Sequence, residues 1–149
     1  MSDQKALGTA GEMVVAAALV YRGWRVSREI TDSAKYDLLA FDPGGSLKRI
    51  QVKVYTNHNG YYVNREKVIS RKKFLYTKDD VDLMVYWFVD TGYIALVDIE
   101  AFGDKKNMKL LPSPVEPDGS VLRNLSGVRF LSGAPFPGDV VWTGPVRFE

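Results

Sequence analysis

The stretch YDLLAFDPGGSLKRIQVKVY, residues 36–55, decides how this chain folds. Residues 36–41 and 47–55 are rich in β-forming residues, and the second run alternates between apolar and polar side chains from Ile50 onwards. The Pro-Gly-Gly sequence between the two runs is a strong turn signal. The stretch therefore predicts a β-hairpin whose connection is residues 42–46.

Three polar side chains of this hairpin are expected to share one face. Gln51 and Lys53 point the same way because side chains alternate across a strand. Pairing Phe41 with Leu47 places Asp37 opposite Gln51, and a register shifted by two residues places it opposite Lys53. In both registers Asp37 lies on the face of Gln51 and Lys53.

This group of side chains is typical of a metal site that works on phosphates. The Asp37 carboxylate, the Gln51 amide oxygen and the Val52 backbone carbonyl are hard oxygen ligands, which suit Mg²⁺ with several waters retained. Lys53 could hold or polarise an attacking water and offset charge on a phosphate. Glu12, in a predicted N-terminal helix, could add a second carboxylate.

Two simpler interpretations of these residues stay open. Asp37 could do no more than pair with Lys53 across the strands. Residues 9–12 (TAGE) also match a capping box, in which Glu12 would only satisfy backbone N–H groups at a helix start.

The rest of the chain predicts an α/β (α+β) fold, with a central mixed β-sheet flanked by helices. Residues 5–22 predict a helix that is apolar almost all round and is therefore expected to be buried against the sheet. Residues 71–77 predict a second helix. Further strands are predicted over residues 24–30, 60–63, 81–89 and 93–99, of which 81–89 should be central and 93–99 its hairpin partner.

The length of 149 residues fits one domain, with a change of composition near residue 103. Six of the seven prolines lie between Pro112 and Pro145. Residues 1–103 are predicted to be the folded core. Residues 104–149 are predicted to be a C-terminal extension, an oligomerisation arm that docks on another subunit.

Composition excludes several classes of protein. The chain has no cysteine, which excludes disulfides, thiolate metal sites and cysteine nucleophiles, and His58 is its one histidine, which excludes a histidine-rich zinc site. The longest apolar run, residues 13–21, is far shorter than a membrane span, and the N-terminus lacks a signal pattern. A cytoplasmic protein is expected.

Charge is distributed unevenly along the chain. Residues 48–78 contain nine Lys or Arg and one acid, and residues 79–104 contain seven acids and no base. Such a basic block can attract anions, although the two blocks could instead pair with each other.

The basic block predicts a contact with double-stranded DNA across residues 55–78, in which bases contact phosphates and amides read base edges from a hairpin turned at 57–60. A solvated hairpin followed by a charged helix is the alternative. The side chains predicted to contact DNA are Tyr55, Asn57, Asn59, Tyr61, Arg65, Lys67, Arg71, Lys72 and Lys73.

Glu12, the YDLL of residues 36–39 and the IQVK of residues 50–53, in that order, resemble the PD-(D/E)XK nuclease superfamily. The resemblance covers about residues 7–100. Within the superfamily the chain is most similar to the small homing endonuclease type that is encoded in a cyanobacterial tRNA group I intron. It implies a restriction-endonuclease-like core over residues 1–103.

The resemblance implies a role for each residue. Asp37 would be the central metal-binding acid, Glu12 a helix carboxylate near the metal, and Lys53 the group that orients water or stabilises the transition state. Gln51 replaces the usual acid of the motif, which puts the number of bound metals in doubt, and Tyr36 replaces its proline.

The implied activity is a Mg²⁺-dependent, sequence-specific homing endonuclease that hydrolyses phosphodiester bonds of double-stranded DNA, with Mn²⁺ as a substitute. Such enzymes assemble, so a tetramer is implied, and symmetrical cleavage requires at least a dimer. Action on DNA places the protein at the nucleoid. The alternatives are a Holliday-junction resolvase or repair nuclease of the same fold, and a non-catalytic DNA-binding module.

Overall fold

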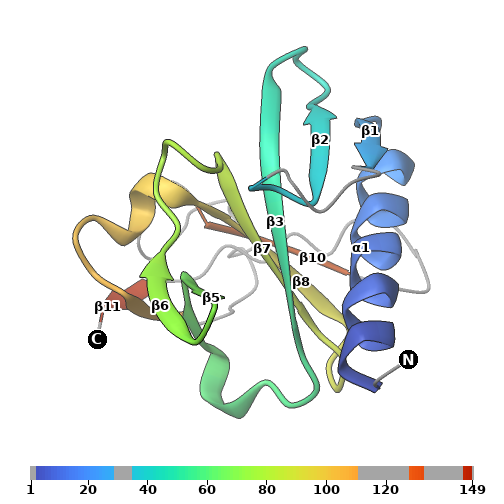
Figure 1. Ribbon diagram of the computed structural model, residues 1–149. Coiled ribbons are helices and arrows are strands. Elements are labelled where there is room, and N and C mark those ends of the chain that lie inside the picture. Colours follow the sequence, from blue (N-terminus) through green and yellow to red (C-terminus); the bar gives the residue numbers. More distant parts are fainter. Residues whose placement is uncertain (1–2, 29–34, 111–127, 133–145, 149) are drawn as a thin grey trace, which may run out of the picture.

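The computed structural model describes residues 3–28, 35–110, 128–132 and 146–148 of the chain. One long helix, α1 (Asp3–Tyr21), packs on a six-stranded sheet of order β1-β2-β3-β7-β8-β10 (Figure 1). β3 pairs with β7 in parallel, and the other neighbours are antiparallel. This mixed sheet confirms the predicted α/β class. Its strands are β1 (Arg25–Arg28), β2 (Leu38–Phe41), β3 (Leu47–Tyr55), β7 (Leu83–Phe88), β8 (Tyr93–Asp98) and β10 (Val128–Ser132).

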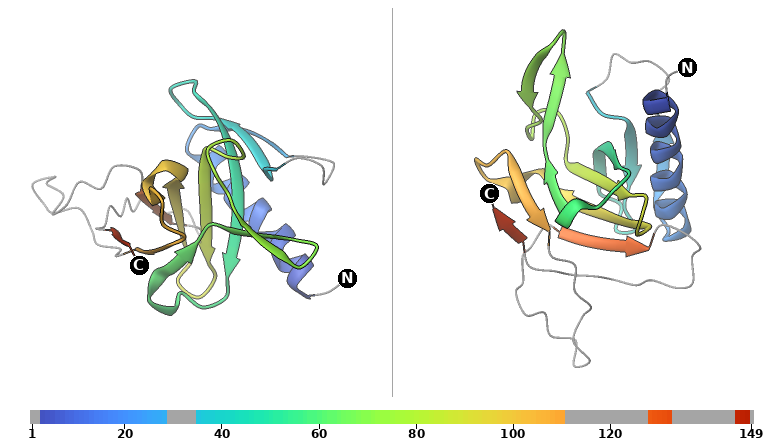
Figure 2. Two further views of the ribbon diagram at one scale, coloured as in Figure 1. Left: turned by 60° about the vertical axis from the view of Figure 1, so that its left-hand side comes forward. Right: turned by 90° about the horizontal axis from the view of Figure 1, so that it is seen from below.

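Two smaller sheets lie beside the main one. The first has the order β11-β9-β4, and the second is a two-stranded ribbon of β5 and β6 that stands away from the main sheet in Figure 2. Their strands are β4 (Tyr62–Asn64), β5 (Glu66–Ile69), β6 (Lys72–Leu75), β9 (Asn107–Leu110) and β11 (Val146–Phe148). Two 3-10 turns, η1 (Asn59–Tyr61) and η2 (Ile99–Phe102), complete the described elements. Residues 66–75 are called the basic ribbon below.

The hairpin that the sequence predicts over residues 36–55 is confirmed. β2 and β3 are antiparallel with Phe41 opposite Leu47 and Leu38 opposite Ile50. The backbone N–H of Asp42 donates to the Ser46 carbonyl at 2.9 Å and closes the turn. This is the first of the two registers considered, and the pairing runs from Phe41 back to Leu38, with Asp37 just before it.

The predicted helix over residues 71–77 is wrong, because β6 occupies this stretch and pairs with β5. Ser70 and Arg71 have φ of 50° and 67° and make the two-residue turn between the strands. Two consecutive positive φ values match the twist of a β-hairpin. The β-forming residues Val68, Ile69 and Phe74 were a better guide here than the run of bases.

The main sheet is buried on both faces, which explains the continuous apolar sequence of β7. Leu83 and Val85 belong to a core cluster that also contains Val15 and Leu19 of α1. Met84, Tyr86 and Phe88 alternate with them and belong to a second cluster on the other face, with residues of β4, β8, β9 and η2. The expected central position of this strand is confirmed.

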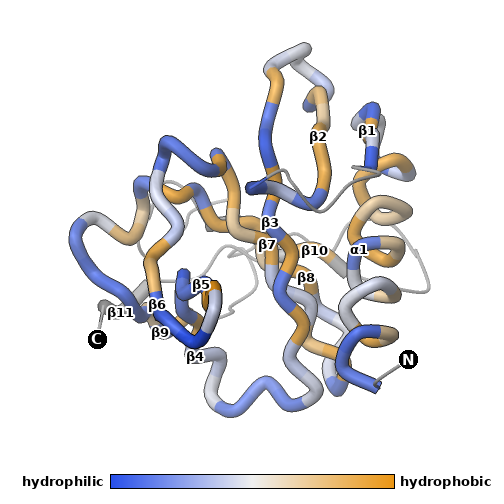
Figure 3. The backbone as a smooth tube through the Cα atoms, in the orientation of Figure 1, coloured by the Kyte–Doolittle hydropathy of each residue, from blue (hydrophilic) through white to orange (hydrophobic). Residues whose placement is uncertain are grey.

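α1 packs against the main sheet as predicted, but only one side of it is buried. Its inner face packs on β3, whereas Met13 and Val20 are 61% and 56% exposed, and Tyr21 is exposed beside them. Figure 3 shows the hydrophobic character of this helix over most of its length. The single main sheet covers one side of the helix, so its outer side presents an apolar face.

The C-terminal segment contributes strands to the core. β10 pairs with β8 at the edge of the main sheet, and β9 pairs with both β4 and β11. Other short apolar stretches of this segment lie outside the described residues, and its role as an oligomerisation arm stays a prediction. Within the described ranges, no helix is long and apolar enough to cross a membrane.

Gly11 provides a test of how α1 is held on β3. A Cβ atom built at Gly11 would lie 2.2 Å from Val54 Cγ2, whereas one at Gly8 meets nothing within 4 Å. We expect Gly11→Ala to destabilise the fold by about 1–3 kcal/mol through overpacking. Gly8→Ala should stabilise it by roughly 0.5–1 kcal/mol through helix propensity. Urea unfolding of both variants measures the difference, and equal effects would show that the helix does not approach β3 this closely.

Candidate active site

The site forms just before β2 begins at Leu38, where the edge of β3 beyond Ile50 has no β2 partner. The Asp37 N–H donates to the Ile50 carbonyl at 2.8 Å, which extends the ladder by one bond. The Asp37 carboxylate then accepts the Val52 N–H at 3.0 Å. In an extended strand the N–H and C=O of one residue point to the same edge, so the Val52 carbonyl also faces the Asp37 side.

Two carboxylates influence each other electrostatically at this edge. The pKa of Asp37 is raised to about 6, and burial is the largest cause. The negative charge of Glu12 also raises this pKa, whereas the Val52 hydrogen bond and the charge of Arg28 oppose the shift. Glu12 itself lies 3.5 Å from Arg28 Nη2. Glu12 is in the middle of α1, so it is no capping residue, and the capping-box interpretation is wrong.

Gln51 and Lys53 complete the predicted group but do not pair with Asp37. The Gln51 amide donates to the Val52 carbonyl at 3.4 Å, and Lys53 Nζ donates to Asn64 Oδ1 at 3.2 Å. Burial lowers the pKa of Lys53, and the nearby charge of Glu66 opposes that shift. Among the ion pairs of the described residues none joins Asp37 to Lys53, so the simple cross-strand salt bridge is contradicted.

The donors of this edge fit a hard divalent cation. The described residues contain no cluster of three or more His, Cys, Asp or Glu that could hold a metal. Two carboxylates, a carbonyl and an amide do suit Mg²⁺, which keeps several waters and shares its remaining positions with phosphate oxygens. The mutual repulsion of Asp37 and Glu12 is the electrostatic feature that a cation would relieve.

The residues predicted to contact DNA divide into two sets. Arg71, Lys72 and Lys73 are exposed at the turn of the basic ribbon, and Asn57 and Asn59 are exposed in the loop after β3. These five are available to a nucleic acid.

The other four predicted DNA contacts are occupied within the fold. Arg65 is buried, and its guanidinium donates to the carbonyls of Lys105, Tyr76 and Gly103. Lys67 pairs with the buried Asp80 at 3.2 Å. Tyr55 stacks on Tyr86 and Phe88, and Tyr61 packs edge-on against Phe88. Arg65 therefore anchors the base of the basic ribbon and is not exposed to a nucleic acid.

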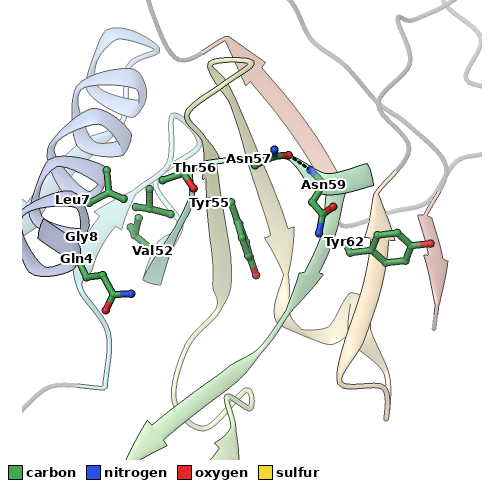
Figure 4. Close-up of a pocket in the computed structure, with 10 residues that line it drawn as sticks. Gln4, Leu7, Gly8, Val52, Tyr55, Thr56, Asn57, Asn59 and Tyr62 are labelled. Carbon is green, nitrogen blue, oxygen red and sulfur yellow. Dashed lines mark hydrogen bonds between the residues drawn. The ribbon is translucent and has the colours of Figure 1, made fainter.

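A pocket of about 690 Å³ adjoins the open edge of β3 (Figure 4). Val52 and Val54 line it from β3, and Gln4 and Gly8 line it from α1. Its far wall is the loop after β3, where the Asn59 N–H donates to Asn57 Oδ1 at 2.8 Å. The polar side chains that line it are amides, hydroxyls and tyrosines without formal charge, so the pocket suits uncharged polar groups such as base edges.

Sequence reasoning missed three residues that act on the predicted site. Asn64 accepts a hydrogen bond from Lys53, Arg28 pairs with Glu12, and the charge of Glu66 acts on Lys53. Asn64 reaches Lys53 only because β4 pairs with β9, a strand more than forty residues away. No local pattern carries that information.

Comparisons with known proteins agree with this geometry. A family model described as PD-(D/E)XK endonuclease matches residues 2–120. Among solved structures, the chain is similar to the bacterial homing endonuclease I-Ssp6803I, with a TM-score of 0.64 and 18% identity. The similarity covers 85% of this chain and 89% of that one, and at this identity it shows a shared fold. No curated protein matches the chain.

The pKa of Asp37 predicts how stability depends on pH. The pKa is 3.8 for an ordinary aspartate and about 6 in the folded protein, so the folded state binds more protons between these values. Stability should therefore fall as pH rises through this window, and the full penalty is present above it. We expect Asp37→Asn to stabilise the metal-free protein by about 1–3 kcal/mol at neutral pH and to have no such effect below pH 3.8. Urea unfolding in a chelator measures this, and a gain that does not vary with pH would contradict it.

Proposed function

Because the chain belongs to the PD-(D/E)XK endonuclease family and is a nuclease, we propose that it is a Mg²⁺-dependent homing endonuclease that cuts double-stranded DNA at specific sequences. The observation that carries the proposal is the placement of Asp37 against the Val52 peptide, with Lys53 one residue further along β3. The fold shared with a homing endonuclease supports it. Such an enzyme would act in the cytoplasm, at the nucleoid, where its DNA substrate lies.

Asp37, Glu12 and the Val52 carbonyl would hold the cation, and Gln51 could join them by turning its amide oxygen outward. The cation would lower the pKa of a bound water and offset charge on the scissile phosphate. Lys53 would orient the attacking water and stabilise the charge that develops on the phosphate oxygens. Mn²⁺ would substitute, because it accepts similar oxygen ligands.

DNA would lie across the open edge of β3, between α1 and the basic ribbon. Arg71, Lys72 and Lys73 would contact phosphates from the ribbon turn, and such contacts supply affinity without sequence information. Asn57 and Asn59 would contact base edges from the pocket. This division of roles supports sequence-specific recognition.

Cleavage of both strands by one kind of active site requires at least two copies of the chain. The apolar outer face of α1, with exposed Met13 and Val20, supports self-association because faces of this kind on soluble proteins are usually covered. A homo-oligomer, with a tetramer as in the sequence-based prediction, is therefore part of the proposal.

Two alternatives remain distinct from this function. A junction resolvase or repair nuclease of the same fold would cut by DNA shape, so a four-way junction of arbitrary sequence would be a better substrate than a duplex library. A non-catalytic DNA-binding module would bind the same duplexes and cut none of them in any divalent metal.

Substitution of the central residues tests the proposal directly. We expect Asp37→Ala and Lys53→Ala to abolish Mg²⁺-dependent cleavage of a randomised duplex library, while DNA binding in Ca²⁺ changes less than about threefold, since neither side chain is proposed to provide DNA affinity. Sequencing of the cut products measures both activity and specificity. Mg²⁺ should raise the melting temperature of wild type and Lys53→Ala but not of Asp37→Ala, because a ligand that binds the folded state stabilises it.

The outcome that would contradict the proposal is loss of folding together with binding in both variants, which would make the two residues structural. Cleavage that persists in Asp37→Ala would remove the proposed metal site.

The basic ribbon makes a separate prediction about salt. Arg71→Ala, Lys72→Ala and Lys73→Ala should each weaken DNA binding and lower the slope of log K against log salt by about 0.9 per lost phosphate contact. Arg25→Ala is the matched control, because it removes the same charge from the edge strand β1, where Arg25 stacks over Phe41. Binding titrations at several salt concentrations give the slopes, and a slope equal to that of the control would exclude the ribbon from the interface.

A further inference from the structure

The ammonium group of Lys53 is held by a residue outside the nuclease motif. Lys53 Nζ donates to Asn64 Oδ1 at 3.2 Å, and Lys53 is only partly accessible on its strand. A lysine side chain has four rotatable bonds, so without such a contact its ammonium would sample many positions. Glu66, whose charge acts on Lys53, would be one competing partner.

Asn64 is itself fixed from several directions. The buried Tyr86 hydroxyl donates to the Asn64 carbonyl at 2.6 Å, and the Glu66 N–H donates to the same Oδ1 that accepts Lys53, at 3.0 Å. The Asn64 backbone also pairs with Asn107 across β4 and β9. Its amide oxygen therefore has a defined position before any substrate arrives.

The chemistry of the acceptor matters as much as its position. A carboxylate at this place would hold the ammonium but also offset its charge. A neutral amide oxygen fixes the ammonium and leaves its positive charge available to a phosphate. An asparagine satisfies both requirements.

Asn64 also connects Lys53 to the base of the basic ribbon. The next residue, Arg65, donates to three backbone carbonyls, and Tyr76 N–H donates to the Arg65 carbonyl at 2.8 Å as the chain leaves β6. The acceptor of Lys53 and the base of the ribbon thus form one hydrogen-bonded unit.

We propose that Asn64 is a positioning residue for catalysis, whose side-chain oxygen holds the Lys53 ammonium in a fixed place for the reaction. This inference rests on the proposed function, because it assigns a role in phosphodiester cleavage. It adds to that function a residue from β4, a strand that is not part of the motif.

Two measurements test the inference, the first without any substrate. NMR of protein labelled with ¹⁵N-lysine detects an ammonium group whose protons are protected from exchange with water. The signal that disappears in Lys53→Ala is assigned to Lys53. This signal should be present in wild type and absent in Asn64→Ala. Asn64→Asp keeps an acceptor at the same position and should keep the signal. Asn107→Ala is the matched control, because it removes an asparagine side chain from the paired position on β9 and should leave the signal unchanged.

The second measurement is the single-turnover cleavage rate on sequences that wild type cuts from the duplex library. Asn64→Ala should be slower by about ten- to a hundredfold, with its DNA affinity in Ca²⁺ unchanged, because misplacement of a reacting group affects the chemical step. If Asn64→Ala does not fold, Asn64→Thr replaces it, since threonine suits a strand and its hydroxyl lies nearer the backbone.

Each outcome is decisive. A protected ammonium in Asn64→Ala, or an unchanged cleavage rate after the signal is lost, would overturn the positioning role while leaving the nuclease proposal intact. An enzyme that cuts no duplex would overturn the proposed function, and the assigned role would fall with it, even where the ammonium signal shows that the contact exists.

Discussion

The structure of the site depends on one hydrogen bond, from the Val52 backbone N–H to the Asp37 carboxylate. β2 pairs with β3 only from Leu38 onwards, and the side chain of the residue before it, Asp37, takes the place of a backbone partner for Val52. That substitution gives Asp37 a fixed position, reduces its access to water and leaves the Val52 carbonyl facing the same edge. The raised pKa of Asp37 follows from this partial burial.

The two halves of the site come from different parts of the chain. Asp37 and Glu12 form an acidic half, brought together by β2 and the middle of α1. Lys53 forms the basic half, held by Asn64 from β4. The separation keeps the acids and the lysine from neutralising each other, which a direct salt bridge would do. An arrangement of this kind is suited to a cation on one side and phosphate charge on the other.

The approach of α1 to β3 is the second constraint. Gly11 lets the helix backbone come close enough to Val54 that no Cβ would fit, and the next residue, Glu12, reaches the edge where Asp37 lies. The same packing leaves Met13 on the outer face. A single stretch of helix thus has a role in packing, in the acidic half and in the surface proposed for self-association.

The sequence by itself determined the hairpin of residues 36–55 and the common face of Gln51 and Lys53, because these depend on alternation and on a short turn. It left two registers open, and the structure selected the one with Phe41 opposite Leu47. The sequence also determined the helix that carries Glu12 and the central strand β7, since both are long apolar segments. Only the tertiary structure decided that Lys72–Leu75 form a strand, that Arg65 is buried, and that Asn64 accepts the Lys53 ammonium. The strand is a local β-hairpin with β5, which the run of bases concealed. The burial of Arg65 and the position of Asn64 depend on contacts with segments far along the chain, and local propensity contains no information about such partners.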